Sequence, residues 1–533
     1  MNVEPQYLKA NVVVQPLVDR WYAWSHLVPP ATLGLNHLDR HLRIMDSYVE
    51  APHVHAAAIA DPAMTGGPFV DLAVERADEI KVMAEDLRRR RSGLLDFVKA
   101  LRDLSTMLSE NAAGYSLEPL YARIPPILRG YVELSYDVQH RATFRLIEPL
   151  LYASSFYDPS AQSLGLFEIQ GDERPFVLST PSLDQPGRVH VDLPFAAPEV
   201  DELARLKWDP RPPGEIGDIM GLDRADASTL GRLLTPDPPP TCRPYQGPGV
   251  RWRYFGHACV LVETGGISVL TDPLVAYAHR GAVARYTFHD LPDVIDCVLI
   301  SHAHQDHTML ETLLQLRHRV RTVVVPRSGG GSLQDPSLKL LLKAVGFPSV
   351  VEVQEMDEID LGPLVVRALP FMGEHADLDI RAKVTYLVEA GERRLFFGSD
   401  TCNVEPFVYR HVRDAVGPID TIFLGMECDG APLDWLYGPV MMAPRTSESW
   451  RMGQSRTLSG SDCAKAVELV RSLGGRQAYV YSMGQEPWLK YLLSLDYDTK
   501  SLPIVESDKL IAWCRESGIE ADRLFGRKEV HIR

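Results

Sequence analysis

Short apolar runs alternate with helical patterns through the second half of the chain. The stretch 251–273 predicts two strands around a glycine turn at Gly265 and Gly266. Further strands are predicted within 294–307, 322–326, 350–354, 364–371, 384–390, 393–400, 420–430 and 477–483, and helices within 307–316, 337–344 and 462–473. Strands interleaved with helices favour an α/β fold of stacked layers.

The first half of the chain has a mixed pattern. Apolar residues between Val70 and Glu110 recur at helical spacing, which predicts a helix there. The stretches 130–137 and 142–151 alternate apolar and polar residues, as strands do. We therefore expect a separate, mixed α+β N-terminal domain.

Six prolines between Pro236 and Pro248 divide the two halves. Proline fixes φ and lacks an N–H donor, so this stretch can be neither helix nor central strand. We predict an N-terminal domain at 1–235, a semi-rigid linker at 236–249, and a metal-binding domain with a C-terminal extension at 250–533. The first domain could restrict access, pair two subunits or dock a carrier protein, and its sequence does not choose between these roles.

Composition and charge exclude several classes of protein. The 533 residues are 45% apolar and 24% charged, which is ordinary globular usage. No apolar run reaches the roughly 18 residues of a membrane helix, and the N-terminus has no signal-peptide pattern. A formal net charge of −16 argues against nucleic acid or an anionic membrane as partner. The seven cysteines form no C-x-x-C pair, which fits reduced thiols and a cytoplasmic location.

The segment from Ser301 to His307 carries the strongest chemical signal. It contains H-x-H-x-D-H and follows directly on a predicted buried strand. On extended backbone His302 and His304 point the same way, so both can bind one ion. Asp306 and His307 fall where the chain turns into a helix, and can face a second ion beside the first. Three histidines and an aspartate in this order predict a two-metal site rather than a polar loop.

This motif resembles the signature of the metallo-β-lactamase superfamily, over roughly residues 250–500. The resemblance implies an αββα sandwich with a two-metal site at the strand ends. Asp272, in Thr271-Asp272-Pro273, matches the first motif, whose aspartate supports the ligand loop from behind. Asp400, at the end of the predicted strand 393–400, matches the fourth motif, whose aspartate bridges both metals.

Two departures from that superfamily bear on the metal. Its third motif usually supplies a histidine, whereas this chain offers Glu374 followed by His375. Neighbours on extended backbone face opposite ways, so we expect only one of the two to reach the metal. The fifth motif usually supplies a histidine too, but 477–488 contains none, which leaves an open position on the second metal. With Glu374 bound, three nitrogens would face three carboxylates, a harder ligand set that favours iron.

The same departures resemble the dinuclear iron β-hydroxylases of nonribosomal peptide pathways, best known from chloramphenicol biosynthesis. The resemblance implies an oxo- or hydroxo-bridged pair of iron ions, dioxygen as co-substrate, and an aromatic amino acid such as p-aminophenylalanine, held as a thioester on a carrier (thiolation) domain. It also implies a homodimer. The implied iron ligands are His302, His304, Asp306, His307, Glu374 and Asp400. The chain has no nucleotide fingerprint and no iron–sulfur cysteine set, so two electrons per turnover must come from a separate donor.

Two features of the substrate region stay open. Glu427 ends the apolar run 421–426 of the predicted strand and is either a catalytic neighbour of the metals, as support or gate, or a surface acid. The segment 429–460 carries Trp435, Tyr437 and Trp450 and is either a lid over an aromatic pocket or a segment packed on its own domain.

The competing function is a dizinc hydrolase of a phosphodiester, lactone or thioester. In that case a hydroxide between the metals attacks the substrate, and His375 is the preferred ligand rather than Glu374. A binding protein without catalysis is disfavoured by the intact ligand set.

Overall fold

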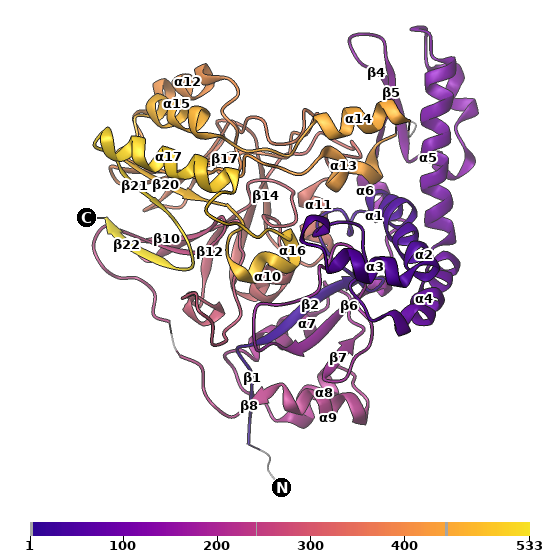
Figure 1. Ribbon diagram of the computed structural model, residues 1–533, viewed down its shortest axis with the longest axis horizontal. Coiled ribbons are helices and arrows are strands. Elements are labelled where there is room, and N and C mark those ends of the chain that lie inside the picture. Colours follow the sequence, from indigo (N-terminus) through magenta and orange to yellow (C-terminus); the bar gives the residue numbers. More distant parts are fainter. Residues whose placement is uncertain (1–3, 241, 443–445, 533) are drawn as a thin grey trace.

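Two seven-stranded sheets lie face to face in the C-terminal half of the chain (Figure 1). The computed structural model describes residues 4–240, 242–442 and 446–532. In order across it, the first sheet contains β14 (Val350–Val353), β13 (Val320–Pro326), β12 (Ile295–Leu299), β11 (Ile267–Thr271), β10 (Cys259–Thr264), β9 (Val250–Gly256) and β22 (Lys528–Ile532). The second contains β15 (Glu358–Asp360), β16 (Val365–Leu369), β17 (Thr385–Ala390), β18 (Arg393–Phe397), β19 (Thr421–Gly425), β20 (Gln477–Tyr481) and β21 (Glu520–Arg523).

Fully buried apolar side chains from both sheets fill the space between them, among them Trp252, Tyr386 and Phe423. A second apolar cluster joins the outer face of the second sheet to α12 (Pro406–Val416), α15 (Cys463–Leu473) and α17 (Leu502–Glu516). These three helices lie together in Figure 1. Helices α10 (Leu310–Leu316) and α11 (Leu338–Ala344) cover the first sheet. The predicted αββα sandwich is therefore confirmed.

The stretch 251–273 forms three strands where two were predicted. The glycine turn joins β10 to β11 as expected, but β9 ends at Gly256 and β10 starts only at Cys259. His257 interrupts the strand with a positive φ of 52°, and the β9–β10 pairing shifts its register beside it. Elsewhere in this domain the sequence did not predict several elements that the structure contains, among them the strands β15, β21 and β22 and the helices α12 and α17.

The N-terminal domain is a mixed α+β unit, as predicted. Its main sheet is antiparallel, in the order β3 (Trp21–Tyr22), β2 (Val12–Val18), β6 (Gln162–Glu168), β7 (Arg188–Val191). Two strand pairs complete it: β1 (Tyr7–Leu8) with β8 (Leu234–Thr235), and β4 (Val132–Tyr136) with β5 (Ala142–Leu146). Its helices are α1 (Pro30–Asn36), α2 (Leu42–Glu50), α3 (Pro52–Ile59), α4 (Ala77–Arg90), α5 (Ser92–Asn111), α6 (Glu148–Tyr152), α7 (Pro198–Arg205), α8 (Pro213–Ile219) and α9 (Arg224–Arg232).

The single helix predicted between Val70 and Glu110 is two helices. The chain breaks between α4 and α5 at Arg91, whose side chain is buried and pairs with Asp19 and Asp158. A buried guanidinium needs carboxylate partners, and the backbone position that lets Arg91 reach them interrupts the helix that the apolar spacing predicted.

One apolar core runs from the N-terminal domain into the first sheet. It joins Val13 and Phe97 to Leu270 and Leu313 without a break. The remaining short helices, α13 (Leu433–Tyr437), α14 (Ser447–Ser455) and α16 (Lys490–Leu493), lie at the end of the sandwich that meets this domain (Figure 1). Within the part of the chain that the structure describes, no helix is both long and apolar enough to cross a membrane.

Glu148 is a buried acid where α6 meets α11, and accepts a hydrogen bond from Ser337 N (3.2 Å). Burial, with Asp335 nearby, raises the pKa of Glu148 from 4.5 to about 7. The folded protein therefore holds a proton that the unfolded chain loses above pH 4.5. This acid's contribution to the free energy of unfolding should fall by roughly 3 kcal/mol as pH rises from about 4.5 to 7.

We expect Glu148→Gln to remove that fall and to make the protein more stable than the wild type at pH 8. Urea unfolding of both proteins at pH 5 and pH 8 measures the difference. An equal stability difference at the two pH values would contradict the assignment.

Candidate metal centre

The predicted metal side chains meet at one edge of the sandwich. Asp272 follows β11, the histidine loop 302–307 follows β12, and Asp400 follows β18. Strands β11 and β12 are parallel in one sheet, and β18, β19 and β20 are parallel in the other. Their carboxyl ends therefore lie on the same side, and the short loops that leave them bring the side chains together.

Glu374 and His375 both face the cluster, so the strand alternation assumed for them is wrong, whereas which of the two binds the metal stays a prediction. Glu374 has a φ of 66°, and Gly373 before it has a φ of 65°. Backbone in this left-handed region does not send successive side chains to opposite sides as a strand does. Glu374 Oε1 lies 3.0 Å from His304 Nδ1, and Glu374 Oε2 lies 2.9 Å from His375 Nδ1.

Three groups of side chains each offer potential ligand atoms that lie within 4.8 Å of one another. They are His302, His304, Glu374 and His375; His257, Asp306 and His307; and His302, His307 and Asp400. Ligand atoms at about 2.0–2.3 Å from one ion are at most about 4.6 Å apart, so each group has nearly the size of one coordination sphere. The third group shares His302 with the first and His307 with the second, so Asp400 lies beside residues of both other groups.

Individual atoms also fit a metal. Ser301 Oγ lies 2.9 Å from His302 Nδ1, which leaves Nε2 of this buried ring without a hydrogen-bond partner, 3.9 Å from Asp400 Oδ2. Nε2 of His375 is also buried and unpartnered. Buried polar atoms without partners are costly, so the unpaired Nε2 of His302, which faces Asp400, indicates a place for a cation.

The pKa shifts of the pocket side chains also indicate that the pocket favours positive charge. Burial lowers the pKa of His304, but the Glu374 carboxylate outweighs it and raises that pKa above its usual value. Burial likewise lowers the pKa of His307, but Asp400 and two further carboxylates raise it well above its usual range. Burial raises the pKa of Glu374, yet His304 and His375 bring it far below its usual value. The carboxylates thus stabilise positive charge on whatever occupies the pocket.

Asp272 lies behind the histidine loop. Its Oδ1 accepts a hydrogen bond from Ser301 N (2.7 Å), and its Oδ2 lies 2.9 Å from His307 Nδ1. With Nδ1 of His307 engaged in this way, Nε2 is the nitrogen that faces Asp400 (3.0 Å). A carboxylate on the far nitrogen fixes the tautomer and the orientation of a metal-binding histidine.

His257 was missed in the sequence. Its Nε2 lies 3.0 Å from Asp306 Oδ2 and 3.2 Å from His307 Nε2. It stands directly after Gly256 at the end of β9, where the apolar pattern suggested an unbroken strand. In the stretch 477–488, which lacks the fifth-motif histidine, Ser482 donates a hydrogen bond to Asp400 Oδ1 (2.7 Å). The pocket therefore contains more nitrogen than the predicted set of three histidines.

Glu427 belongs to none of the three groups. Its Oε1 accepts a hydrogen bond from Asp429 N (3.0 Å), while Oε2 is buried without a partner. Burial, together with Asp429 and Asp400, raises the pKa of Glu427 to about 8. Glu427 is half-buried with one buried carboxylate oxygen, and its place near the metals stays a prediction.

The aromatic segment 429–460 does not form one lid. Tyr437 is buried against His304, and Trp435 donates from Nε1 to Gly66 O of the N-terminal domain (3.0 Å). Trp450 is 60% exposed. Residues 443–445 of this segment lie outside the described part of the chain. Trp435 thus contacts the other domain, which neither predicted alternative contained, whereas Tyr437 packs against its own domain, as the second alternative expected.

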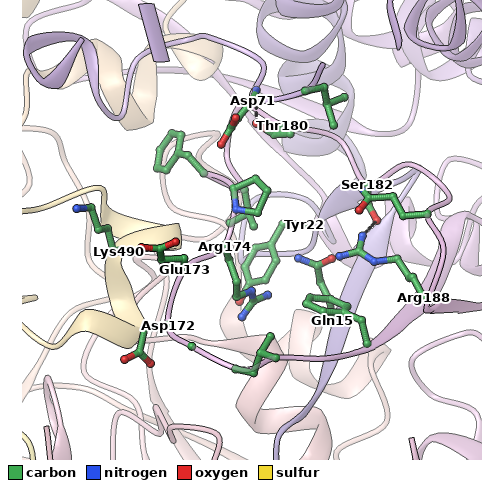
Figure 2. Close-up of a pocket in the computed structure, with 18 of the residues that line it drawn as sticks. Gln15, Tyr22, Asp71, Asp172, Glu173, Arg174, Thr180, Ser182, Arg188 and Lys490 are labelled. Atoms are coloured by element: carbon green, nitrogen blue, oxygen red, sulfur yellow. Dashed lines mark hydrogen bonds between the residues drawn. The ribbon is translucent and has the colours of Figure 1, made fainter. Parts of the chain in front are cut away.

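A cavity of about 1250 Å³ lies between the N-terminal domain and α16 (Figure 2). Gln15, Tyr22, Arg174 and Arg188 line it from one side and Lys490 from the other. None of the residues in the three metal groups lines this cavity. Arg174 turns inward from it to pair with Glu311 on α10, so the cavity wall is also a contact between the two domains.

A two-sheet sandwich with a dinuclear site at its strand ends defines a metalloprotein of the metallo-β-lactamase fold. Residues 7–238 match the family described as diiron non-heme beta-hydroxylase N-terminal domain, and residues 268–481 match the beta-lactamase superfamily domain. The chain is 38% identical over 532 residues to the 4-amino-L-phenylalanyl-(CmlP-peptidyl-carrier-protein) 3-hydroxylase of Streptomyces venezuelae, covering 98% of this chain and 99% of that protein. The chain belongs to the diiron β-hydroxylase family.

Solved structures agree over the whole length. The crystal structure of CmlA, a diiron beta-hydroxylase from Streptomyces venezuelae, matches with a TM-score of 0.92 and 37% identity, covering 99% of this chain and 100% of that one. A mutant of the CmlA beta-hydroxylase matches with a TM-score of 0.91 and the same 37% identity. The protein is therefore a diiron hydroxylase, an oxidoreductase, and the dizinc hydrolase alternative is disfavoured.

Proposed function

We propose that the protein hydroxylates the β-carbon of an aromatic amino acid, such as p-aminophenylalanine, held as a thioester on the carrier domain of a nonribosomal peptide synthetase. The observation that carries this proposal is the similarity along 98% of the chain to a hydroxylase that acts on a carrier-bound aminophenylalanyl group. A β-hydroxylated aromatic residue is a building block for antibiotic biosynthesis, which we propose as the setting, in the cytoplasm.

The proposed metal ligands are His302, His304, Asp306, His307, Glu374 and Asp400. Two iron ions, when bound, supply the activation of dioxygen that no side chain can provide. The chain's own residues hold the ions and set the orientation of the ligands. Asp272 fixes the His307 ring from behind, and Ser301 engages Nδ1 of His302. Glu427 is proposed to act near the open side of the site, where its protonated form could donate a hydrogen bond.

The overall reaction requires a reductant. One oxygen atom of dioxygen is inserted into the β C–H bond, and the other leaves as water with two electrons and two protons. The carrier-bound substrate supplies no such electrons, so we propose a separate electron donor. We further propose that the protein forms a homodimer.

We propose domain limits of 1–235 and 250–533, joined by the linker 236–249. Support comes from the pairing of β1 with β8, which brings the two ends of the N-terminal domain together. Among its described residues, 236–249 form no helix or strand.

The proposal predicts strict dependence on the carrier. Iron-loaded, reduced protein should add one oxygen to the aromatic aminoacyl group on the carrier, and should leave the free amino acid unchanged. Mass spectrometry of the carrier after exposure to isotopically labelled dioxygen measures this directly. His302→Ala, which removes a proposed ligand, is the matched inactive control.

Two outcomes would remove parts of the proposal. Equal turnover of free and carrier-bound amino acid would eliminate the tethered substrate. Near-stoichiometric zinc in protein from iron-supplemented cells, with hydrolysis that survives without oxygen, would restore the hydrolase alternative.

A further inference from the structure

Tyr437 lies against a proposed metal ligand. It is the last residue of α13 and is 2% exposed. Its hydroxyl lies 2.7 Å from His304 Nε2, while His304 Nδ1 faces Glu374 Oε1 at 3.0 Å. If Nδ1 offers its lone pair to an ion shared with Glu374, Nε2 carries the proton and donates it to the tyrosine oxygen. A hydrogen-bond acceptor on the far nitrogen selects the tautomer of a metal-binding histidine and fixes the ring.

The N-terminal domain holds α13 in this place. Arg40 donates from Nη2 to the carbonyl oxygens of Trp435 and Leu436. Arg102 donates from Nη2 to Pro439 O (3.3 Å). The last carbonyls of a helix have no partner within the helix, and guanidinium groups satisfy them well. Arg40 stands on a short π-helix, His37–His41, a distortion that often occurs at functional sites.

A second contact reaches the histidine loop itself. Ser25 Oγ donates a hydrogen bond to Ala303 O, between His302 and His304. His26, the next residue, meets the Tyr437 ring edge-on at 6.0 Å. The N-terminal domain thus contacts His304's surroundings from two directions, through the loop backbone and through Tyr437.

We propose that Tyr437 is a positioning residue for His304, and that the N-terminal domain holds it there through Arg40, which makes this domain part of the metal centre. The inference rests on the proposed ligand role of His304. It gives the N-terminal domain a task that access control, subunit pairing or carrier docking would not require.

Tyr437→Phe tests the first part, because it keeps the ring and its packing and removes only the oxygen. We expect the iron-free variant to unfold at the wild-type temperature, while its affinity for ferrous iron, measured by chelator competition, falls about 10–100-fold. The ligand-field spectrum of the reduced, iron-loaded variant should change at one of its two iron sites. Unchanged affinity and an unchanged spectrum would overturn the positioning role.

Arg40→Gln tests the second part at a distance from the metal. It should produce a smaller change of the same kind in iron affinity and spectrum, and its effect should not add to that of Tyr437→Phe. Arg88→Gln is the matched control, since Arg88 is on the same domain but pairs with the exposed Asp46. Additive effects, or an effect of Arg88→Gln equal to that of Arg40→Gln, would show that Arg40 does not act through Tyr437.

These measurements separate the inference from the proposed function. A wild-type protein that binds no iron would remove both. A wild-type protein with two irons and a Tyr437→Phe variant indistinguishable from it would remove the inference alone.

Discussion

Glu374→Ala is expected to lose well over 100-fold in affinity for iron at one of the two sites, and with it all measurable hydroxylation. The loss should exceed the roughly 10–100-fold typical of groups that only orient a ligand. Glu374 offers one carboxylate oxygen toward His304 and the other toward His375, at 3.0 and 2.9 Å. Removing it deletes a proposed ligand and leaves these histidines facing each other without a balancing charge. Iron per chain after gel filtration, with chelator competition, measures the effect.

His375→Ala is the matched comparison. Its Nδ1 faces Glu374, so we expect His375 to hold the carboxylate rather than bind the metal, and the variant to retain two irons with a modest drop in affinity. If His375→Ala alone loses metal while Glu374→Ala keeps it, the ligand assignment at this loop is wrong. That result would also favour the nitrogen-rich ligand set of a zinc hydrolase.

Arg174→Met is expected to lower the free energy of unfolding by about 3–5 kcal/mol, because it leaves a buried carboxylate without its partner. Arg174 and Glu311 are only 5% and 3% exposed and form two parallel hydrogen bonds of 2.9 and 2.9 Å. The guanidinium also lies over the Tyr491 ring at 3.6 Å. Urea unfolding followed by circular dichroism measures the loss.

Two variants calibrate that result. The double variant Arg174→Met with Glu311→Leu removes both charges and should recover most of the stability, since a buried ion pair is replaceable by apolar groups. Arg145→Met breaks the exposed pair with Glu133 and should cost less than about 1 kcal/mol. A loss for Arg174→Met no larger than that for Arg145→Met would mean that the buried pair is not holding the domains together.

Much of the sandwich could be predicted because its strands are short, apolar and bounded by turns. The apolar run that forms β12 ends just before His302, so the sequence alone predicted that the metal site lies at a strand end. The stretch from Val70 to Glu110 is mostly helical, as predicted, but it forms two helices rather than one. The spacing of apolar residues does not show that Arg91 pairs with Asp19 at the break.

The metal pocket was less predictable where it depends on backbone conformation. Gly373 hinted at a turn, and a Cβ there would lie 2.7 Å from that of Cys402. Glu374 itself has a left-handed φ that its residue type does not announce, so the alternation rule failed. His257 was missed for two reasons: it too has a left-handed φ, and an isolated histidine at a strand end has no spacing pattern. The contact of Tyr437 with His304 joins residues far apart in sequence, and only the folded chain reveals it.

The uninterrupted core between the N-terminal domain and the first sheet sets a rule for building hybrids of these enzymes. Exchanging residues 1–235 for those of a relative would replace one side of this shared core and keep the side chains that pack against it. Such chimaeras should express poorly unless the surface of α10 is exchanged as well, so new substrate preferences are better sought by changing side chains than by shuffling whole modules.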